Sequence, residues 1–114
     1  MLTAVTGMVR LTVAIRVTPR QERDVLDALR FIKLGTLLEP GCLTCTAWTE
    51  PDATVHYVEE WAGEADLRRH VRSDRFTSLL GVLETSAEPP QVSFHFVSET
   101  RGLEYAAELR GDAD

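Results

Sequence analysis

The hydrophobic residues of this chain change their spacing in a fixed order, and that order restricts the fold more than any other feature. Residues 9–18 alternate strictly between apolar and other side chains, which predicts a β-strand. A helical spacing follows, introduced by Thr18 as a cap, Pro19, and Gln21 at the position that a capping box favours. The helix should end before Pro40.

The same order then repeats, with two strands in place of one. Residues 42–50 and 54–61 are predicted strands, joined as a hairpin by a short turn. A helical spacing covers residues 64–85, and Ser73 divides it because a Ser followed by an Asp is a typical helix start. Residues 91–99 alternate again and predict the last strand.

The resulting order, β-α-β-β-α-β, predicts an α+β fold of the ferredoxin-like type. Such a fold has a four-stranded antiparallel sheet with the helices on one face. We take residues 1–114 as a single domain, with a loose N-terminal arm at residues 1–8 and a C-terminal tail at residues 102–114. A short helix is expected within the tail, and the last four residues are expected to be disordered.

The sheet face without helices is predicted to be too apolar for full exposure to water. Its apolar residues should be Ala14, Val58, Val97 and either Ala47 or Trp48. A second copy of the chain covering this face would produce a dimeric α+β barrel, so the expected partner is a homodimer mate.

The charge of the chain excludes several kinds of partner. Lys and Arg number 12 against 18 Asp and Glu, a formal net charge of −6. Nucleic acids and anionic membrane surfaces attract basic proteins, so neither is expected to bind. The sequence shows neither a signal-peptide pattern nor an apolar run long enough to span a membrane, and a cytoplasmic location is expected.

Cys42 and Cys45 form the only Cys-x-x-Cys pair in the chain. The pair opens a predicted strand, whereas thioredoxin-like redox pairs lie at a helix N-terminus, where the thiol pKa is lowered. Side chains three residues apart in a regular strand point to opposite faces. A zinc site would need two more ligands, which the sequence does not supply at typical spacing. We therefore expect two structural thiols and no bound metal.

Four rings converge in the stretch from residue 54 to residue 83. The predicted third strand places Tyr57 and Trp61 on one sheet face, and the following helix directs His70 and Phe76 toward that face. His70 occupies a position where the apolar pattern would otherwise place a leucine. These residues are either ordinary core aromatics with one hydrogen-bonded histidine or the lining of a cavity.

The same stretch resembles a known family. The pattern Glu59-x-Trp61, then Glu64-Ala65-Asp66-Leu67-x-x-His70, then Ser73-x-x-Phe76, is similar to the antibiotic biosynthesis monooxygenase (ABM) family. Members of that family are small dimeric α+β barrels, and better-known members oxygenate aromatic polyketides or quinols without metal or flavin. The resemblance therefore implies a cofactor-independent monooxygenase with a small aromatic, quinol or polyketide-like substrate and no cofactor.

The resemblance also implies roles for individual residues. His70 would accept a proton, because imidazole titrates near neutral pH. Trp61 and Tyr57 would donate hydrogen bonds to an oxyanion. The walls of the substrate site would be Phe31, Phe76 and Phe94. Glu59 would tether a helix or the partner subunit.

Two departures from the family pattern reduce the number of family activities expected for this chain. The chain contains no Asn, although several family oxygenases place an Asn beside the Trp to hold substrate or oxygen. Leu80 stands where the haem-degrading branch has its iron-ligating His, so haem degradation is disfavoured. Three functions stay open: a monooxygenase, a non-catalytic dimeric barrel that binds a hydrophobic ligand or serves as a companion subunit, and a barrel isomerase or cyclase.

Overall fold

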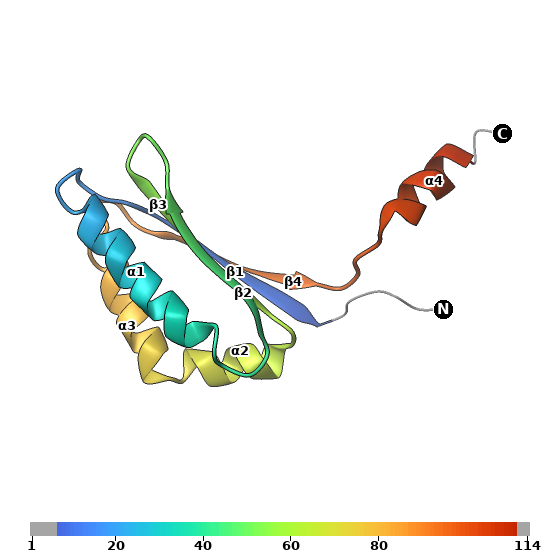
Figure 1. Ribbon diagram of the computed structural model, residues 1–114, viewed down its shortest axis with the longest axis horizontal. Helices are drawn as coiled ribbons and strands as arrows, with labels where there is room; N and C mark the ends of the chain where they lie inside the picture. Colours follow the sequence, from blue (N-terminus) through green and yellow to red (C-terminus); the bar gives the residue numbers. More distant parts are fainter. Residues whose placement is uncertain (1–6, 112–114) are drawn as a thin grey trace.

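A computed structural model describes residues 7–111 of the chain. Within these residues, four strands and four helices alternate along the sequence (Figure 1). In chain order they are β1 (Met8–Arg16), α1 (Glu22–Thr36), β2 (Cys42–Thr49), β3 (Thr54–Trp61), α2 (Glu64–Val71), α3 (Asp74–Leu83), β4 (Gln91–Val97) and α4 (Leu103–Gly111).

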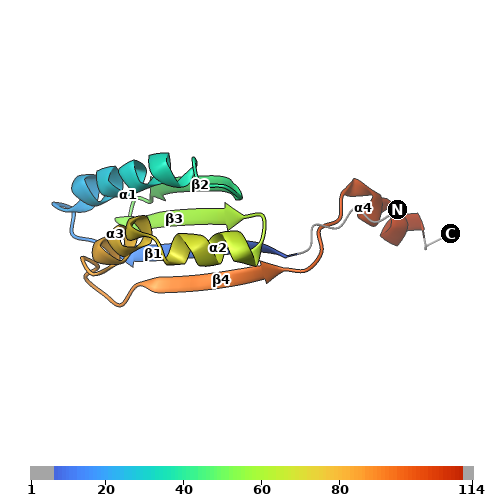
Figure 2. The same cartoon turned by 90° about the horizontal axis from the view of Figure 1, so that it is seen from below.

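The strands form one antiparallel sheet in the order β2-β3-β1-β4. Helices α1, α2 and α3 lie on one face of this sheet, as the two views in Figures 1 and 2 show. The predicted ferredoxin-like α+β fold is therefore confirmed. The two edges of the sheet are β2 and β4, and the central strands β1 and β3 carry most of the core.

The core forms between the sheet and the three helices because both central strands alternate strictly in burial. Every second residue of β1 from Val9 to Ile15 is buried, and so is every second residue of β3 from Val55 to Trp61. The helices contribute the apolar residues that their 3.6-residue spacing predicted. These are Val25, Leu29, Ile32, Leu67, Leu79 and Leu83.

The start of α1 differs from its prediction. The strand ends at Arg16, residues 19–21 form a turn, and α1 begins at Glu22 without a side-chain cap. Thr18 accepts backbone hydrogen bonds through its carbonyl, and the Gln21 side chain reaches back to the Thr18 hydroxyl at 3.1 Å. The pairing of Thr18 with Gln21 was thus predicted, but the turn moves the helix start by three residues. At the other predicted cap, the Ser73 hydroxyl accepts from the Phe76 N–H and starts α3 as expected.

A β-bulge at the start of β2 overturns the expected placement of the two cysteines. Cys42 pairs with Trp61 and Thr44 with Glu60, so Leu43 is an extra residue in β2. The bulge shifts the alternation by one position, and Cys42 and Cys45 consequently face the helices together. Cys45 is buried in the core and Cys42 packs against it.

The sheet face without helices mixes apolar and polar side chains. Trp48, and not Ala47, lies on this face, because Trp48 pairs with His56 while Ala47 pairs with the buried Tyr57. Trp48 is 42% exposed and its ring stacks on His56 at 4.9 Å. Across the centre, Glu60 accepts hydrogen bonds from Arg10 and from the Thr44 hydroxyl, at 2.8 Å each.

The N-terminal end differs from its prediction, whereas the helix expected in the C-terminal tail is present. Met8 belongs to β1 rather than to a loose arm, and residues 1–6 and 112–114 lie outside the described part. The C-terminal tail contains α4, which Figure 1 shows beyond the end of the sheet, away from the other helices. Of the helices in residues 7–111, none combines the length and apolar character that crossing a membrane requires.

Candidate functional site

Strand β3 places three side chains with polar groups in the core beneath the helices. Tyr57, Glu59 and Trp61 occupy alternate positions and therefore face the same side. All three have 0% exposure, although Glu59 is an ionisable residue that is almost never fully buried without partners. Helix α2 adds His70, which is also fully buried.

The Glu59 carboxylate is the centre of this cluster. One oxygen accepts a hydrogen bond from the Tyr57 hydroxyl at 2.5 Å and lies 2.9 Å from Nε2 of His70. The other oxygen accepts from the indole N–H of Trp61 at 2.9 Å. Three donors thus converge on one buried carboxylate, which is the arrangement that a buried charge requires.

His70 connects this carboxylate to a second one. Its Nδ1 lies 3.0 Å from both oxygens of Glu39, in the loop after α1, and Glu39 in turn accepts from Arg75 at 2.5 Å. Burial alone would lower the pKa of His70, but hydrogen bonds and charges from Glu59 and Glu39 outweigh it and raise the pKa. Both ring nitrogens of His70 are therefore bonded to acids, and these acids favour its protonated form.

The rings that were expected to line a cavity pack against one another instead. The Trp61 and His70 rings lie 4.7 Å apart, and Phe76 packs edge-on against His70 at 5.6 Å. Phe76 is half-buried, so it separates the cluster from the protein surface. Trp61, His70 and Phe76 thus pack as one group, and Tyr57 is linked to this group through Glu59.

The thiols next to the cluster are not activated. Burial raises the pKa of Cys42 to about 11 and that of Cys45 to about 12. The Cys45 thiol donates to the Tyr57 hydroxyl at 3.3 Å. Burial, followed by the charge of Glu59, also raises the pKa of Tyr57, so its hydroxyl stays protonated. Neither cysteine has the thiolate character that redox chemistry needs.

The other two predicted wall residues lie away from the cluster. Phe31 is 78% exposed on α1, where it lines a surface hollow with Gly35 and Arg75. Phe94 is 42% exposed on the edge strand β4, opposite Leu11. The structure thus groups Phe76 with His70, Trp61 and Tyr57, and places Phe31 and Phe94 elsewhere.

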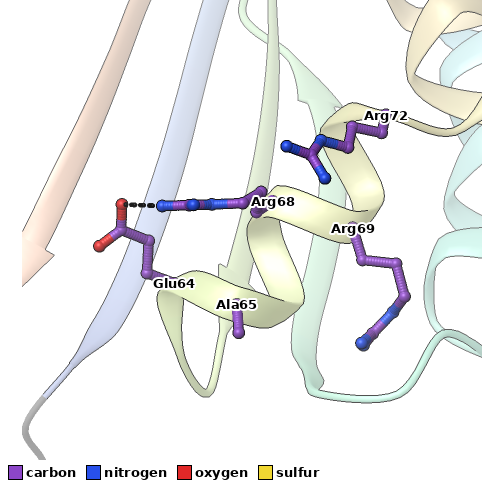
Figure 3. Close-up of a pocket in the computed structure, with 5 residues that line it drawn as sticks. All are labelled: Glu64, Ala65, Arg68, Arg69 and Arg72. Atoms are coloured by element: carbon purple, nitrogen blue, oxygen red, sulfur yellow. Dashed lines mark hydrogen bonds and ion pairs between the residues drawn. The ribbon is translucent and has the colours of Figure 1, made fainter.

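A second surface hollow, of about 480 Å³, lies on the exposed side of α2 (Figure 3). It is lined by Glu64, Ala65, Arg68, Arg69 and Arg72. Arg68 pairs with Glu64 at 3.3 Å, and Arg69 pairs with Asp66 at 2.8 Å. The arginines whose helical positions faced away from the core thus form a basic surface.

Glu39 and Arg75 were not predicted as site residues. Glu39 was part of a helix-ending signal and Arg75 one of several helical arginines, so no local pattern marked either of them. Within residues 7–111, no cluster of three or more His, Cys, Asp or Glu side chains is arranged to hold a metal ion.

Comparison with known proteins identifies the family. The sequence profile named antibiotic biosynthesis monooxygenase matches residues 8–80, which include every strand and helix of the site. The chain belongs to this family. The match covers β1 through most of α3, and thus the Glu59, Trp61, His70 and Phe76 positions on which the resemblance was based.

Solved structures share the fold of this ABM chain. A conserved protein from Methanosarcina mazei superimposes with a TM-score of 0.73 at 22% identity, covering 82% of this chain and 96% of its own. A conserved protein from Bacteroides thetaiotaomicron, described as a possible oxidoreductase, gives 0.71 at 21% identity, covering 83% and 99%. An antibiotic biosynthesis monooxygenase gives 0.66 at 20% identity, covering 76% and 95%. Such identities show a common fold only. No curated protein matches the sequence.

Proposed function

We propose that this ABM protein is a cofactor-independent monooxygenase of a small aromatic, quinol or polyketide-like metabolite, acting as a homodimer in the cytoplasm. Family membership supports the reaction class. The observation that carries the proposal is the hydrogen-bonded chain from Tyr57 through Glu59 and His70 to Glu39. Buried charged networks of this kind concentrate at functional sites, because a stable core does not require them.

The chain offers a route for the proton that a phenolic substrate must lose. Glu59 is fully buried, whereas the Glu39 side chain is 14% exposed and the Arg75 side chain 38% exposed. A proton accepted near Trp61 and Tyr57 can reach solvent by successive transfers through Glu59, His70 and Glu39. The ionised substrate would then supply the electron to oxygen. The Trp61 N–H and the Tyr57 O–H, each of which donates its one hydrogen to Glu59, would turn to the anion once Glu59 has taken up the proton.

Access to the cluster requires Phe76 to move. It is the half-buried ring packed on His70, so a planar substrate would replace it against the imidazole. In this proposal Phe76 is the substrate-contacting wall, and His70, Trp61 and Tyr57 are the catalytic groups. Phe31 and Phe94 would contact substrate only if the bound state differed from the structure described above.

Oxygen consumption with a panel of hydroquinones, anthrones and naphthols tests the proposal. We expect uptake to fall at least tenfold in Tyr57→Phe, which removes one hydroxyl and preserves the shape of the ring. Asp24→Asn, exposed in the first turn of α1, is the control and should retain full activity. Wild-type protein that consumes no oxygen with any of these phenols, yet binds one of them, would contradict the proposal.

One observation favours a second candidate, a non-catalytic binding or companion protein. Tyr57, Trp61 and His70 all have their polar groups bonded within the cluster and none is exposed. A purely structural network would also have all its polar groups hydrogen-bonded within the cluster. A ligand-dependent rise in melting temperature without turnover would identify this second function.

A further inference from the structure

Within residues 7–111, helix α4 has no packing partner. All its residues are exposed, including Leu103 at 85%, Tyr105 at 41% and Leu109 at 56%. Isolated helices shorter than about 12 residues are marginal in water, and α4 has nine. A helix of this length therefore needs a surface on which to pack.

The segment before α4 directs the helix away from its own sheet. Arg101 pairs with Glu99 at 2.7 Å and lies over the Tyr105 ring at 4.9 Å. The Gly102 N–H donates to the Glu104 carboxylate at 2.7 Å. These contacts lie entirely within the C-terminal segment 99–105. Both ribbon views show α4 projecting beyond the sheet (Figures 1 and 2). The partner surface is thus more accessible on another molecule than on the same one.

We propose that α4 of one copy docks on the basic surface of α2 in a second copy. The proposal rests on the homodimer of the proposed function and names a contact within it. Glu104 and Glu108 are four residues apart and share one face of α4, while Arg68 and Arg72 have the same spacing on α2. When the acidic face of α4 packs on the arginine face of α2, each of the two glutamates can lie beside one of the two arginines.

The receiving surface has room and charge for this contact. Arg68 and Arg72 line the hollow of Figure 3, and among the ion pairs of the described residues none includes Arg72. An adjoining hollow of about 190 Å³ is lined by Leu67 and Val71, and Val71 is 39% exposed. Tyr105 and Leu109, each next to a glutamate on α4, supply the matching apolar contacts.

Cross-linking between differently tagged full-length chains tests the contact directly. Mixing a Leu109→Cys chain with a Val71→Cys chain under mild oxidation should give a mixed disulfide dimer. The native thiols will not compete, because the raised pKa values of Cys42 and Cys45 leave them unreactive. Leu109→Cys mixed with Leu38→Cys, an 86% exposed position in the turn after α1, is the control and should give at least tenfold less product.

Charge reversal provides the second measurement, by amide hydrogen exchange of residues 103–111. Glu104→Arg/Glu108→Arg should abolish protection of α4, and so should Arg68→Glu/Arg72→Glu. Mixing equal amounts of these two variants should restore protection in about half of the α4 helices, because both contacts are complementary in the heterodimer and random exchange makes half of the dimers heterodimers. Arg23→Glu/Arg30→Glu on exposed α1 changes the charge equally and should leave protection unchanged.

The outcomes separate this inference from the homodimer itself. A wild-type protein that is monomeric by light scattering would overturn both. A dimer without the Leu109–Val71 cross-link, or with α4 unprotected in the wild type, would overturn the docking alone. A cross-link that forms within single Leu109→Cys/Val71→Cys chains, but not between chains, would also overturn it.

Discussion

At the scale of single residues, the protonation of His70 contributes to how stability depends on pH. Its pKa is raised in the folded protein because the two carboxylates outweigh burial, so the folded state retains this proton at a pH where the unfolded chain has lost it. The stabilisation is thus complete below the ordinary histidine pKa of about 6.5. It disappears as pH rises through the folded-state value.

Glu59→Gln tests this dependence, because it removes one of the two charges that hold the proton on His70. We expect the His70 pKa to fall, and the loss of unfolding free energy between pH 6 and pH 9 to become smaller than in the wild type. An NMR titration of the imidazole and urea unfolding at several pH values measure both effects. An unchanged His70 pKa in Glu59→Gln would contradict the assigned network.

The cysteines allow a separate prediction at this scale. Cys42→Ser/Cys45→Ser should retain the fold and any oxygen uptake, because neither thiol is ionised. Its melting temperature should fall by several degrees, since a buried serine hydroxyl replaces the weakly polar thiol of Cys45 at a cost of roughly 1–3 kcal/mol. Calorimetry and mass spectrometry of the wild type are the measurements. A native Cys42–Cys45 disulfide, or lost uptake in a folded variant, would reverse the assignment.

The sequence predicted part of this residue-scale picture, and the missing part has a physical cause. Alternation placed Tyr57, Glu59 and Trp61 correctly, and the helical spacing directed His70 toward them. The pairing of His70 with Glu39 depends on how a loop lies across a helix, which no local period encodes. The bulge at Leu43 likewise reversed the predicted placement of the two cysteines on opposite faces, because one inserted residue inverts the side chain of Cys42 before it.

At the scale of elements, the packing of α1 against α3 depends on a glycine. A Cβ added at Gly35 would lie 2.3 Å from Nε of Arg75, the residue that pairs with Glu39. A glycine within a helix normally destabilises it by up to about 1 kcal/mol relative to alanine. Close approach of the Arg75 guanidinium explains why the chain has glycine here.

Gly35→Ala should therefore fail to produce the usual stabilisation, because Arg75 must leave Glu39 to make room. The matched control is Gly81→Ala in α3, where an added Cβ meets nothing within 4 Å and about 0.5–1 kcal/mol of stabilisation is expected. In an Arg75→Ala background, Gly35→Ala should stabilise as Gly81→Ala does. Urea unfolding of the four variants measures the coupling, and equal gains from both alanines in the wild-type background would refute it.

The sequence predicted every strand and the helices α1, α2 and α3 that cover the sheet. Each of these elements buries one face, and the spacing of its apolar residues shows whether it is a strand or a helix. The ends of elements were less predictable, since they depend on tertiary contacts. The turn at residues 19–21 delays α1, and the last strand stops at Val97, two residues before its predicted end. Helix α4 has little apolar periodicity, and its direction depends on contacts within the C-terminal segment 99–105.

At the scale of the whole molecule, the open face of the sheet is the surface on which the proposed homodimer depends. Val58 lies near its centre, between Thr12 of β1 and Thr46 of β2, and Trp48 is on the same face. Isolated polar pairs such as Arg10 with Glu60 interrupt the apolar residues but do not cover them. Because Val58 lies near the centre of the face, a twofold axis through that centre would place Val58 near its counterpart.

We therefore expect a dimer at micromolar concentration, with light scattering giving twice the chain mass of 12.7 kDa. Val58→Lys should raise the dimer dissociation constant by at least tenfold, because two like charges would meet near the symmetry axis in a site shielded from water. Thr77→Lys, on the exposed side of α3, adds the same charge outside the face and should leave the dimer intact. If Val58→Lys and Thr77→Lys dimerise equally well, the open face is not the interface. A wild-type protein that remains monomeric at micromolar concentration would contradict the homodimer, and the apolar residues of the open face would then have no partner.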